Sequence, residues 1–213
     1  MQANSETKTA APARTGGRDQ VRKLTVTAML SAVAFVLMFL DFPIPMIMPS
    51  FVKMDFSDLP ELLGAFALGP MYGVLISLIK NLIHLLLASS TGGVGELCNF
   101  LFGAVFAWVA GFVYKRNKTR RSAVLGAVLG AAAMAIVSIP LNYFLTYPAY
   151  VVIYGMPLDA IIGMYQAILP SVGGLLECLV IFNMPWTLAK GLLDAVLCML
   201  IYKPLSPILH GRR

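Results

Sequence analysis

The amino-acid sequence predicts an all-α integral membrane protein with six transmembrane helices. The chain has 213 residues, of which 59% are hydrophobic and only 12% charged, and its mean hydropathy is +0.81. Soluble domains carry roughly a quarter charged residues, so an ordinary cytoplasmic enzyme is excluded. Uncharged stretches such as 24–40 and 122–157 approach or exceed the roughly 20 residues that one helix needs to cross a bilayer.

The basic residues lie in three short clusters, which predict the loops that face the cytoplasm. Residues 8–23 and 115–121 each hold five of the 16 basic residues, and positions 203, 212 and 213 add three. Short basic loops stay on the cytoplasmic side, so we expect both termini and 115–121 there. Because these clusters flank apolar helices and form no single folded face, the net charge of +6 does not indicate nucleic-acid binding.

The N-terminal part is divided by breaks in hydropathy. Residues 1–23 are polar and basic, and we expect a disordered cytoplasmic tail there. The first helix follows over 24–40, and Asp41 with the prolines after it begins an outer loop that ends near residue 56.

The apolar stretch 59–87 is too long for one comfortable span and carries Gly69-Pro70 in its middle. Proline inside a helix breaks or kinks it. Two short helices, 57–68 and 71–87, would put the basic 115–121 loop in the cytoplasm, whereas one helix would put it outside. We therefore predict a hairpin of two helices.

The remaining elements follow from the same criteria. The segment 147–183 must begin and end outside, so we expect its apolar part, 161–182, to be interfacial or re-entrant. The membrane domain then covers 24–204, and 205–213 form a second cytoplasmic tail. The expected turn and helices are an outer turn at 88–95 and helices at 96–114, 122–146 and 185–202.

Charged residues inside spans are costly and need partners. A hairpin folded at residues 69–70 brings Lys80 within reach of Asp58 or Glu61. Lys190 and Asp194 are four residues apart, the spacing of a side-chain pair on one helix face. We expect both groups to be structural ion pairs.

The outer ends of these elements collect amides, hydroxyls, an ammonium and aromatic rings. Such groups suit a neutral planar ligand with polar edges, which is hydrogen-bonded at its rim and stacked across its face. The predicted ligand-binding residues are Lys53, Asp55, Phe56, Leu59, Glu96, Asn99, Asn142, Tyr143, Asn183, Thr187 and Lys190.

Small residues recur at helix-packing spacing in three helices. The stripes in the fourth and fifth helices, Gly103-Ala107-Gly111 and Gly126-Gly130, are expected to pack the protein's own helices. Ala28 and Ala32 in the first helix serve internal packing or partner docking.

The sequence contains no motif for catalysis, ATP hydrolysis or metal binding. Its three cysteines have no close spacing, which indicates neither a disulfide framework nor a zinc site. We expect neither an enzyme nor a cofactor.

Several runs together resemble the riboflavin-specific S components, the substrate-capture subunits of energy-coupling factor (ECF) vitamin transporters. KMDFSDLP at 53–60, continued to residue 70, resembles their first loop and second helix. The likeness covers about 24–202 and extends through IKNL at 79–82, STGGVGE at 90–96, LCNF at 97–100, NYF at 142–144 and PWTLAKG at 185–191.

This resemblance implies six helices, a pocket near the outer face under the first loop, and riboflavin as the transported ligand. Asn142, Thr187 and Lys190 match ligand-contacting positions, although Asn is expected where Thr187 stands, and the outer segment 147–182 is longer than in the family. Ala28 and Ala32 match the stripe that docks a membrane T component powered by two ATPases. The resemblance also implies the plasma membrane of a prokaryote.

The alternative class is a stand-alone secondary transporter or channel for a small solute. Lys80, His84, Asp55 and Glu61 would then be coupling groups, with His84 at the level of Asp55 in the hairpin.

Overall fold

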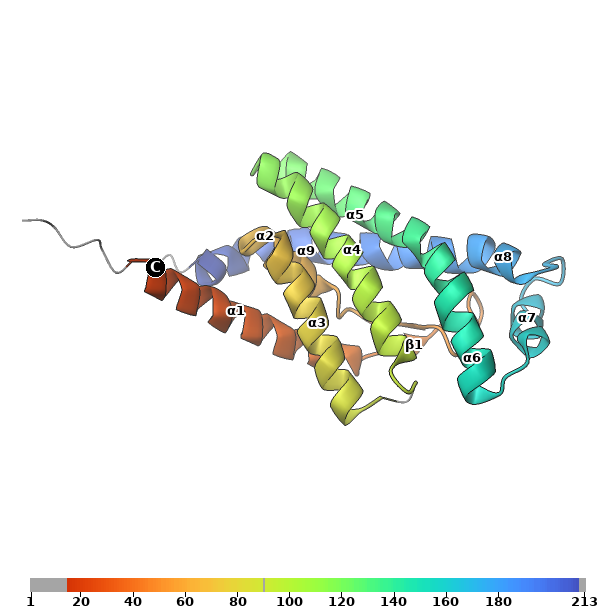
Figure 1. Cartoon of the computed structure of the whole chain (residues 1–213). Helices are drawn as coiled ribbons and strands as arrows, with labels where there is room; N and C mark the ends of the chain where they lie inside the picture. The colour runs from red at the N-terminus through yellow and green to blue at the C-terminus, as the bar shows by residue number, and fades with distance from the viewer. Residues whose placement is uncertain (1–14, 90, 211–213) are drawn as a thin grey trace, which may run out of the picture.

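The computed structural model describes residues 15–89 and 91–210, with side chains described for 17–89 and 91–202. This part of the chain is a helical bundle in which α3, α4 and α5 lie side by side in chain order, and α9 returns alongside α5 (Figure 1). Two short antiparallel strands, β1 (Phe42–Pro43) and β2 (Lys53–Met54), form the sheet between the first two helices.

The first helix, α1, covers Thr15–Met38 and therefore begins before the predicted residue 24. Residues 15–23 are helical, so the prediction of disorder is wrong for them, while residues 1–14 lie outside the described part. Asp19 pairs with Arg22 at 2.7 Å and with Lys23 at 3.0 Å. Opposite charges three and four residues apart stabilise a helix, which explains the early start.

The predicted break at Gly69-Pro70 is confirmed. Helix α2 covers Leu59–Ala67 and α3 covers Pro70–Leu87. Gly69 has φ of 120°, which glycine adopts readily, and Pro70 suits the first turn of a helix because it has no N–H to leave unsatisfied. The two helices pack against each other as a hairpin.

Five helical stretches within the described residues are long and apolar enough to cross a membrane. Helix α2, with nine residues, is not among them. At 1.5 Å per residue it rises only about 13 Å, less than half of the hydrocarbon layer. The five stretches are Gly17–Met38, Pro70–Leu87, Val94–Arg116, Arg120–Tyr154 and Leu175–Tyr202.

The last two membrane stretches are longer than the sequence predicts, and each contains a π-helical turn. Helix α5 (Arg120–Leu141) continues through η1 (Asn142–Thr146) into α6 (Tyr147–Tyr154). Likewise α8 (Leu175–Cys178) continues through η2 (Leu179–Asn183) into α9 (Met184–His210).

The expected re-entrant or interfacial segment 161–182 is therefore divided between two helices. Its first residues belong to α7 (Leu158–Gln166), and its last residues form the beginning of the final membrane helix. Helix α9 also extends to His210, so residues 205–210 continue the helix and are not a separate tail.

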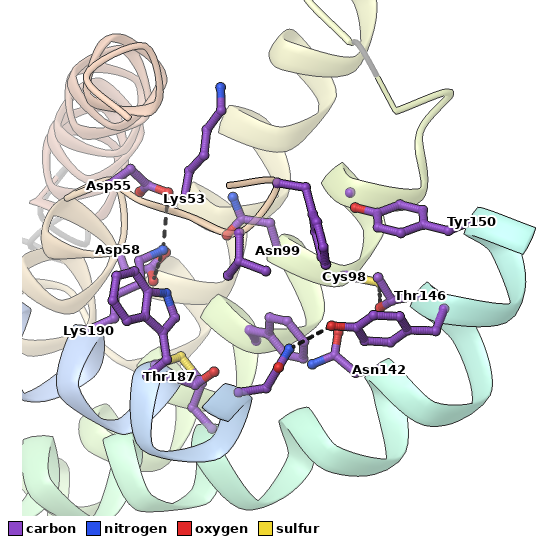
Figure 2. A pocket seen from close by; sticks show the side chains of 18 residues that line it. Lys53, Asp55, Asp58, Cys98, Asn99, Asn142, Thr146, Tyr150, Thr187 and Lys190 are labelled. Carbon is purple, nitrogen blue, oxygen red and sulfur yellow. Dashed lines mark hydrogen bonds and ion pairs between the residues drawn. The ribbon is translucent and has the colours of Figure 1, made fainter. Parts of the chain in front are cut away.

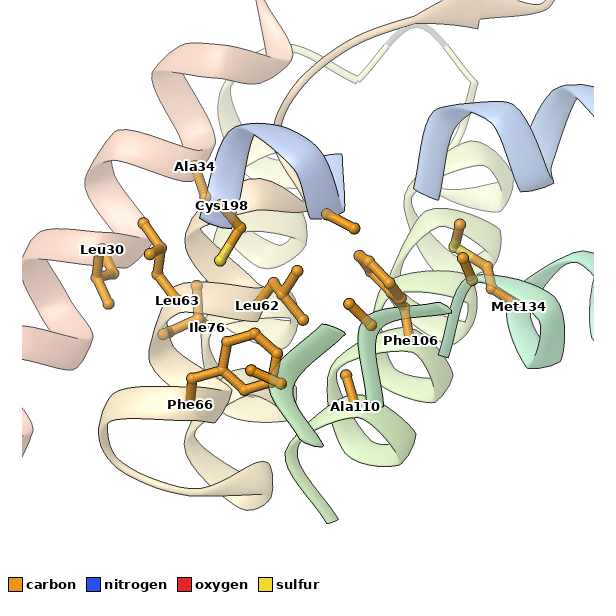
Figure 3. Packing of buried hydrophobic residues seen from close by; sticks show 14 of the residues in the cluster. Leu30, Ala34, Leu62, Leu63, Phe66, Ile76, Phe106, Ala110, Met134 and Cys198 are labelled. Atoms are coloured by element: carbon orange, nitrogen blue, oxygen red, sulfur yellow. The ribbon is translucent and has the colours of Figure 1, made fainter. Parts of the chain in front are cut away.

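The small-residue stripes of α4 (Val94–Arg116) and α5 pack the protein's own helices, as predicted. The stripe of α4 lies against α2 and α3, and the stripe of α5 lies against α4. A Cβ at Gly126 would lie 2.6 Å from the carbonyl oxygen of Ala110, and one at Gly130 would lie 2.8 Å from that of Phe106. The two glycines let the backbones of α4 and α5 approach so closely that no larger residue fits at either position. Figure 3 shows Phe106 and Ala110 in the core that α1, α2, α3 and α9 also share.

Ala28 and Ala32, in contrast, lie on an exposed face of α1. The opposite face buries Leu30 and Ala34 in the core (Figure 3). Met29, Val33 and Val36 are at least half exposed, so the apolar strip around the two alanines is not covered by the described part of the chain.

Candidate ligand-binding pocket

A cavity of about 210 Å³ opens at the end of the bundle where α4 and α9 begin (Figure 2). The segment 51–58, which contains β2 and ends just before α2, supplies one wall. The facing walls come from α4, from the π-turn η1 with α6, and from η2 with the first turns of α9. Segments far apart in the chain therefore meet at one site.

Seven of the eleven predicted ligand-binding residues line this cavity. They come from different segments that meet at this end of the bundle. The seven are Lys53, Asp55, Asn99, Asn142, Asn183, Thr187 and Lys190.

The other four lie elsewhere. The ring of Phe56 packs near that of Phe42, and Leu59 packs against the hydrophobic core. Glu96 is buried away from the cavity, where it accepts a hydrogen bond from Thr91 and contacts His84 Nδ1 at 2.8 Å. Tyr143 is 40% exposed on the outside of η1.

Other lining residues were missed by the sequence analysis, although helical spacing could have found some of them. Cys98 and Phe102 share a face of α4 with Asn99, and Thr146 and Tyr150 follow Asn142 at intervals of four. Residues three or four apart lie on one side of a helix. The aromatic residues Phe51, Tyr147 and Trp186 complete the walls.

One end of the pocket is charged. Lys190 contacts Asp55 Oδ2 at 3.2 Å and Asp58 Oδ2 at 3.0 Å. The other carboxylate oxygen of Asp58 accepts a hydrogen bond from Lys80 at 2.8 Å, and Lys80 also contacts Glu61 at 2.5 Å. Asp58 thus bridges two lysines, one from α3 and one from α9, and ties the segment before α2 to both helices.

These contacts test the two ion pairs that the sequence predicts. Lys80 pairs with both predicted partners, so that prediction is confirmed. The predicted Lys190–Asp194 pair is wrong, because Lys190 reaches Asp55 and Asp58 instead. Asp194 is fully buried, and its carboxylate oxygens have no hydrogen-bond partner among the described residues.

The other end of the pocket is neutral (Figure 2). Tyr165 donates a hydrogen bond to Asn183 Oδ1 at 2.7 Å, and Asn183 Nδ2 donates to the Tyr147 hydroxyl at 3.1 Å. The hydroxyls of Tyr147 and Tyr165 are also hydrogen-bonded to each other. Burial raises the pKa of Tyr165 well above its usual value, so this phenol is a donor at every physiological pH. The ring of Phe51 meets those of Tyr147, Tyr150 and Tyr165 edge-on.

Several polar lining side chains have no hydrogen-bond partner in the described part of the chain, among them the amides of Asn99 and Asn142 and the hydroxyl of Thr187. Asn142 is also almost fully buried. Buried polar groups are nearly always hydrogen-bonded, and a group left without a partner costs about 1–3 kcal/mol. These amide and hydroxyl groups are therefore available to a ligand that offers both donors and acceptors.

The fold and the pocket define a helical membrane protein with a polar-lined cavity at one end of its bundle. The three cysteines are free and buried, and no cluster that could hold a metal ion occurs among the described residues. Residues 22–202 match the family described as "ECF transporter, substrate-specific component", and the chain belongs to this family.

Individual relatives match over nearly their whole length. The chain is 34% identical over 196 residues to "Riboflavin transporter FmnP" of Bacillus subtilis, covering 91% of this chain and 97% of that protein. It is 34% identical to "Riboflavin transporter RibU" of Staphylococcus aureus, covering 89% and 93%. A solved structure of the S component of a bacterial ECF transporter superimposes with a TM-score of 0.70 at 34% identity, over 91% of this chain and 99% of that one.

Proposed function

We propose that this protein is the riboflavin-capturing S component of an ECF transporter in the plasma membrane of a prokaryote. It binds riboflavin outside and delivers it with a membrane T component and two ATPases. The observation that carries the proposal is the set of unpartnered amide and hydroxyl groups in the pocket, in a chain related to riboflavin transporters over about nine-tenths of its length.

The chemistry of the pocket suits this ligand. The flavin ring system is planar and uncharged, with carbonyl, imine and N–H groups along one edge and a chain of hydroxyls attached. Asn99, Asn142 and Thr187 offer complementary donors and acceptors, while Phe51 and Trp186 offer ring faces and edges. Lys190 can share its ammonium with a ligand carbonyl or hydroxyl while it remains beside Asp55.

The proposed topology has six passes with both termini in the cytoplasm and the pocket near the outer face. It is supported by the basic clusters at residues 8–23 and 115–121 and by the separation of α2 from α3. The second pass consists of the short α2 together with the four residues between β2 and α2, which include a turn.

The proposed docking strip for the T component is formed by Ala28 and Ala32. It is supported by the exposure of both residues on α1 and by their spacing of one helical turn. Small residues at this spacing let a second helix approach closely in lipid.

The test is a riboflavin titration of the purified protein in detergent, followed by quenching of flavin fluorescence. We expect saturable binding with one riboflavin per chain, and co-purified yellow flavin when cells are grown with the vitamin. Absence of saturable binding by the folded protein would contradict the proposal. Binding of riboflavin combined with uptake that needs no ATPase or T component would favour a stand-alone transporter.

A further inference from the structure

The neutral end of the pocket contains three side chains that form a closed ring of hydrogen bonds. Tyr147 begins α6, Tyr165 lies in α7, and Asn183 ends η2. All three are buried, with at most 6% of each residue exposed. Tyr147 and Asn183 line the cavity, whereas Tyr165 lies behind them and does not.

The direction of every hydrogen bond in this ring follows from counting protons. A phenol has one O–H, and Tyr165 uses it to donate to Asn183 Oδ1. Tyr147 must therefore be the donor in its bond with Tyr165. One of the two lone pairs on the Tyr147 oxygen accepts from Asn183 Nδ2. The three bonds run head to tail around the ring, so each hydroxyl has spent its only proton inside it.

This arrangement fixes what the ring can offer to a ligand. Both phenol protons are used, so Tyr147 can contribute only a lone pair to the cavity. An amide nitrogen carries two protons, and the hydrogen bonds of the described residues use one of those on Asn183. The second N–H of Asn183 is the single donor that the ring has left.

We propose that Tyr165 is a positioning residue, which locks the amide of Asn183 so that this remaining N–H points at a hydrogen-bond acceptor on the ligand. The acceptor is a carbonyl oxygen or an imine-type ring nitrogen of a planar ligand. This inference rests on the proposed function and assigns to that site a residue that never touches the ligand.

The surroundings of Tyr165 allow this role to be separated from simple packing. Its ring lies between apolar neighbours, with ring centroids 5.2 Å from Phe182 and 6.2 Å from Phe51. Tyr165→Phe keeps that packing and removes only the hydroxyl. Without it, Asn183 Oδ1 loses its donor and the amide can rotate, so the N–H is no longer held in one direction.

The experiment is a double-mutant cycle on riboflavin affinity, using Tyr165→Phe, Asn183→Ala and the double variant of the full chain in detergent. We expect Tyr165→Phe alone to weaken riboflavin binding five- to tenfold. In the Asn183→Ala background the same change should alter the affinity by less than twofold, because the amide it positions is gone. Tyr72→Phe, on α3 and away from the cavity, is the matched control and should leave the affinity unchanged.

Thermal unfolding of each variant without riboflavin gives a second readout. Tyr165→Phe should lower the unfolding temperature no more than Asn183→Ala does, since the packing is kept and only hydrogen bonds of the ring are lost. Equal weakening in both backgrounds, or no weakening in the wild-type background, would overturn the positioning role. If wild-type protein bound no riboflavin at all, the proposed function would fail instead, so the two failures are distinguishable.

Discussion

The two ends of the pocket satisfy their polar groups in different ways. At the charged end, Lys190 is held by Asp55 and Asp58, which both belong to the segment between β2 and α2. At the neutral end, Tyr147, Tyr165 and Asn183 belong to helices and close a ring among themselves. The ion pairs of the charged end thus hold a loop against the bundle, whereas the hydrogen bonds of the neutral end join helices to one another.

This difference indicates which substitutions should lower the free energy of unfolding most. Removing one member of a buried ion pair leaves an unpaired charge in an apolar environment, which costs more than removing one neutral hydrogen bond. Substitutions at the charged end should therefore lower both the free energy of unfolding and the affinity for riboflavin. Substitutions at the neutral end should lower mainly the affinity.

The largest effect is expected at Lys80, which is fully buried between Asp58 and Glu61. Lys80→Met leaves Glu61 without its partner and should lower the free energy of unfolding by about 3–5 kcal/mol. Chemical unfolding in detergent measures this loss. The control is Lys53→Met, because Lys53 pairs with Asp41 at the surface, where a pair contributes at most about 1 kcal/mol. Equal losses in the two variants would remove the distinction between buried and exposed pairs.

The second effect concerns Lys190, where the charged end meets the cavity. Lys190→Ala removes the contacts to Asp55 and Asp58 and should weaken riboflavin binding by more than tenfold. Titration with riboflavin measures the affinity of this variant. The control is Lys118→Ala, because Lys118 is exposed in a loop. An unchanged dissociation constant would exclude Lys190 from the site.

The third effect tests the neutral end. Asn142→Ala should weaken riboflavin binding about tenfold, because a lost buried hydrogen bond costs about 1–3 kcal/mol. Its unfolding temperature should stay close to that of the wild type, since the amide has no partner within the described protein. Asn117→Ala, at the exposed end of α4, is the matched amide control. A large loss of stability with unchanged affinity would assign Asn142 to the scaffold.

The smallest effect on affinity is expected far from both ends, on α1. Ala28→Trp combined with Ala32→Trp should abolish co-purification of the T component and riboflavin uptake, yet leave the affinity of the isolated protein nearly intact. A pull-down beside a titration measures both, with Val124→Trp on the exposed face of α5 as the control. If affinity fell together with assembly, the strip would serve internal packing. Survival of both would refute its docking role.

The sequence predicted the features that depend on local chemistry. The break at Gly69-Pro70 follows from backbone geometry, and the contacts of Lys80 follow from folding the hairpin at that break. The pairing of Lys190 could not be found in this way, because its partners lie 135 and 132 residues before it, in a loop whose path is set by tertiary packing.

The π-helical turns were missed for a related reason. Helical patterns in a sequence are recognised by a period of 3.6 residues, and a π-turn inserts extra backbone that shifts this period. Asn142 and Asn183 lie in such turns, and both were predicted as site residues from their chemistry. Tyr165 carries no comparable signal, since it joins Tyr147 and Asn183 from 18 residues away on either side.

The short length of α2 has a consequence for how the chain enters the bilayer during synthesis. A nine-residue segment with Glu61 in its first turn offers too little apolar surface to be inserted independently, and α3 carries the charge of Lys80. Inserted together as a hairpin, the two segments neutralise each other's charges before either meets hydrocarbon. We therefore expect α2 and α3 to enter the membrane as one unit, with the turn at Gly69 already formed.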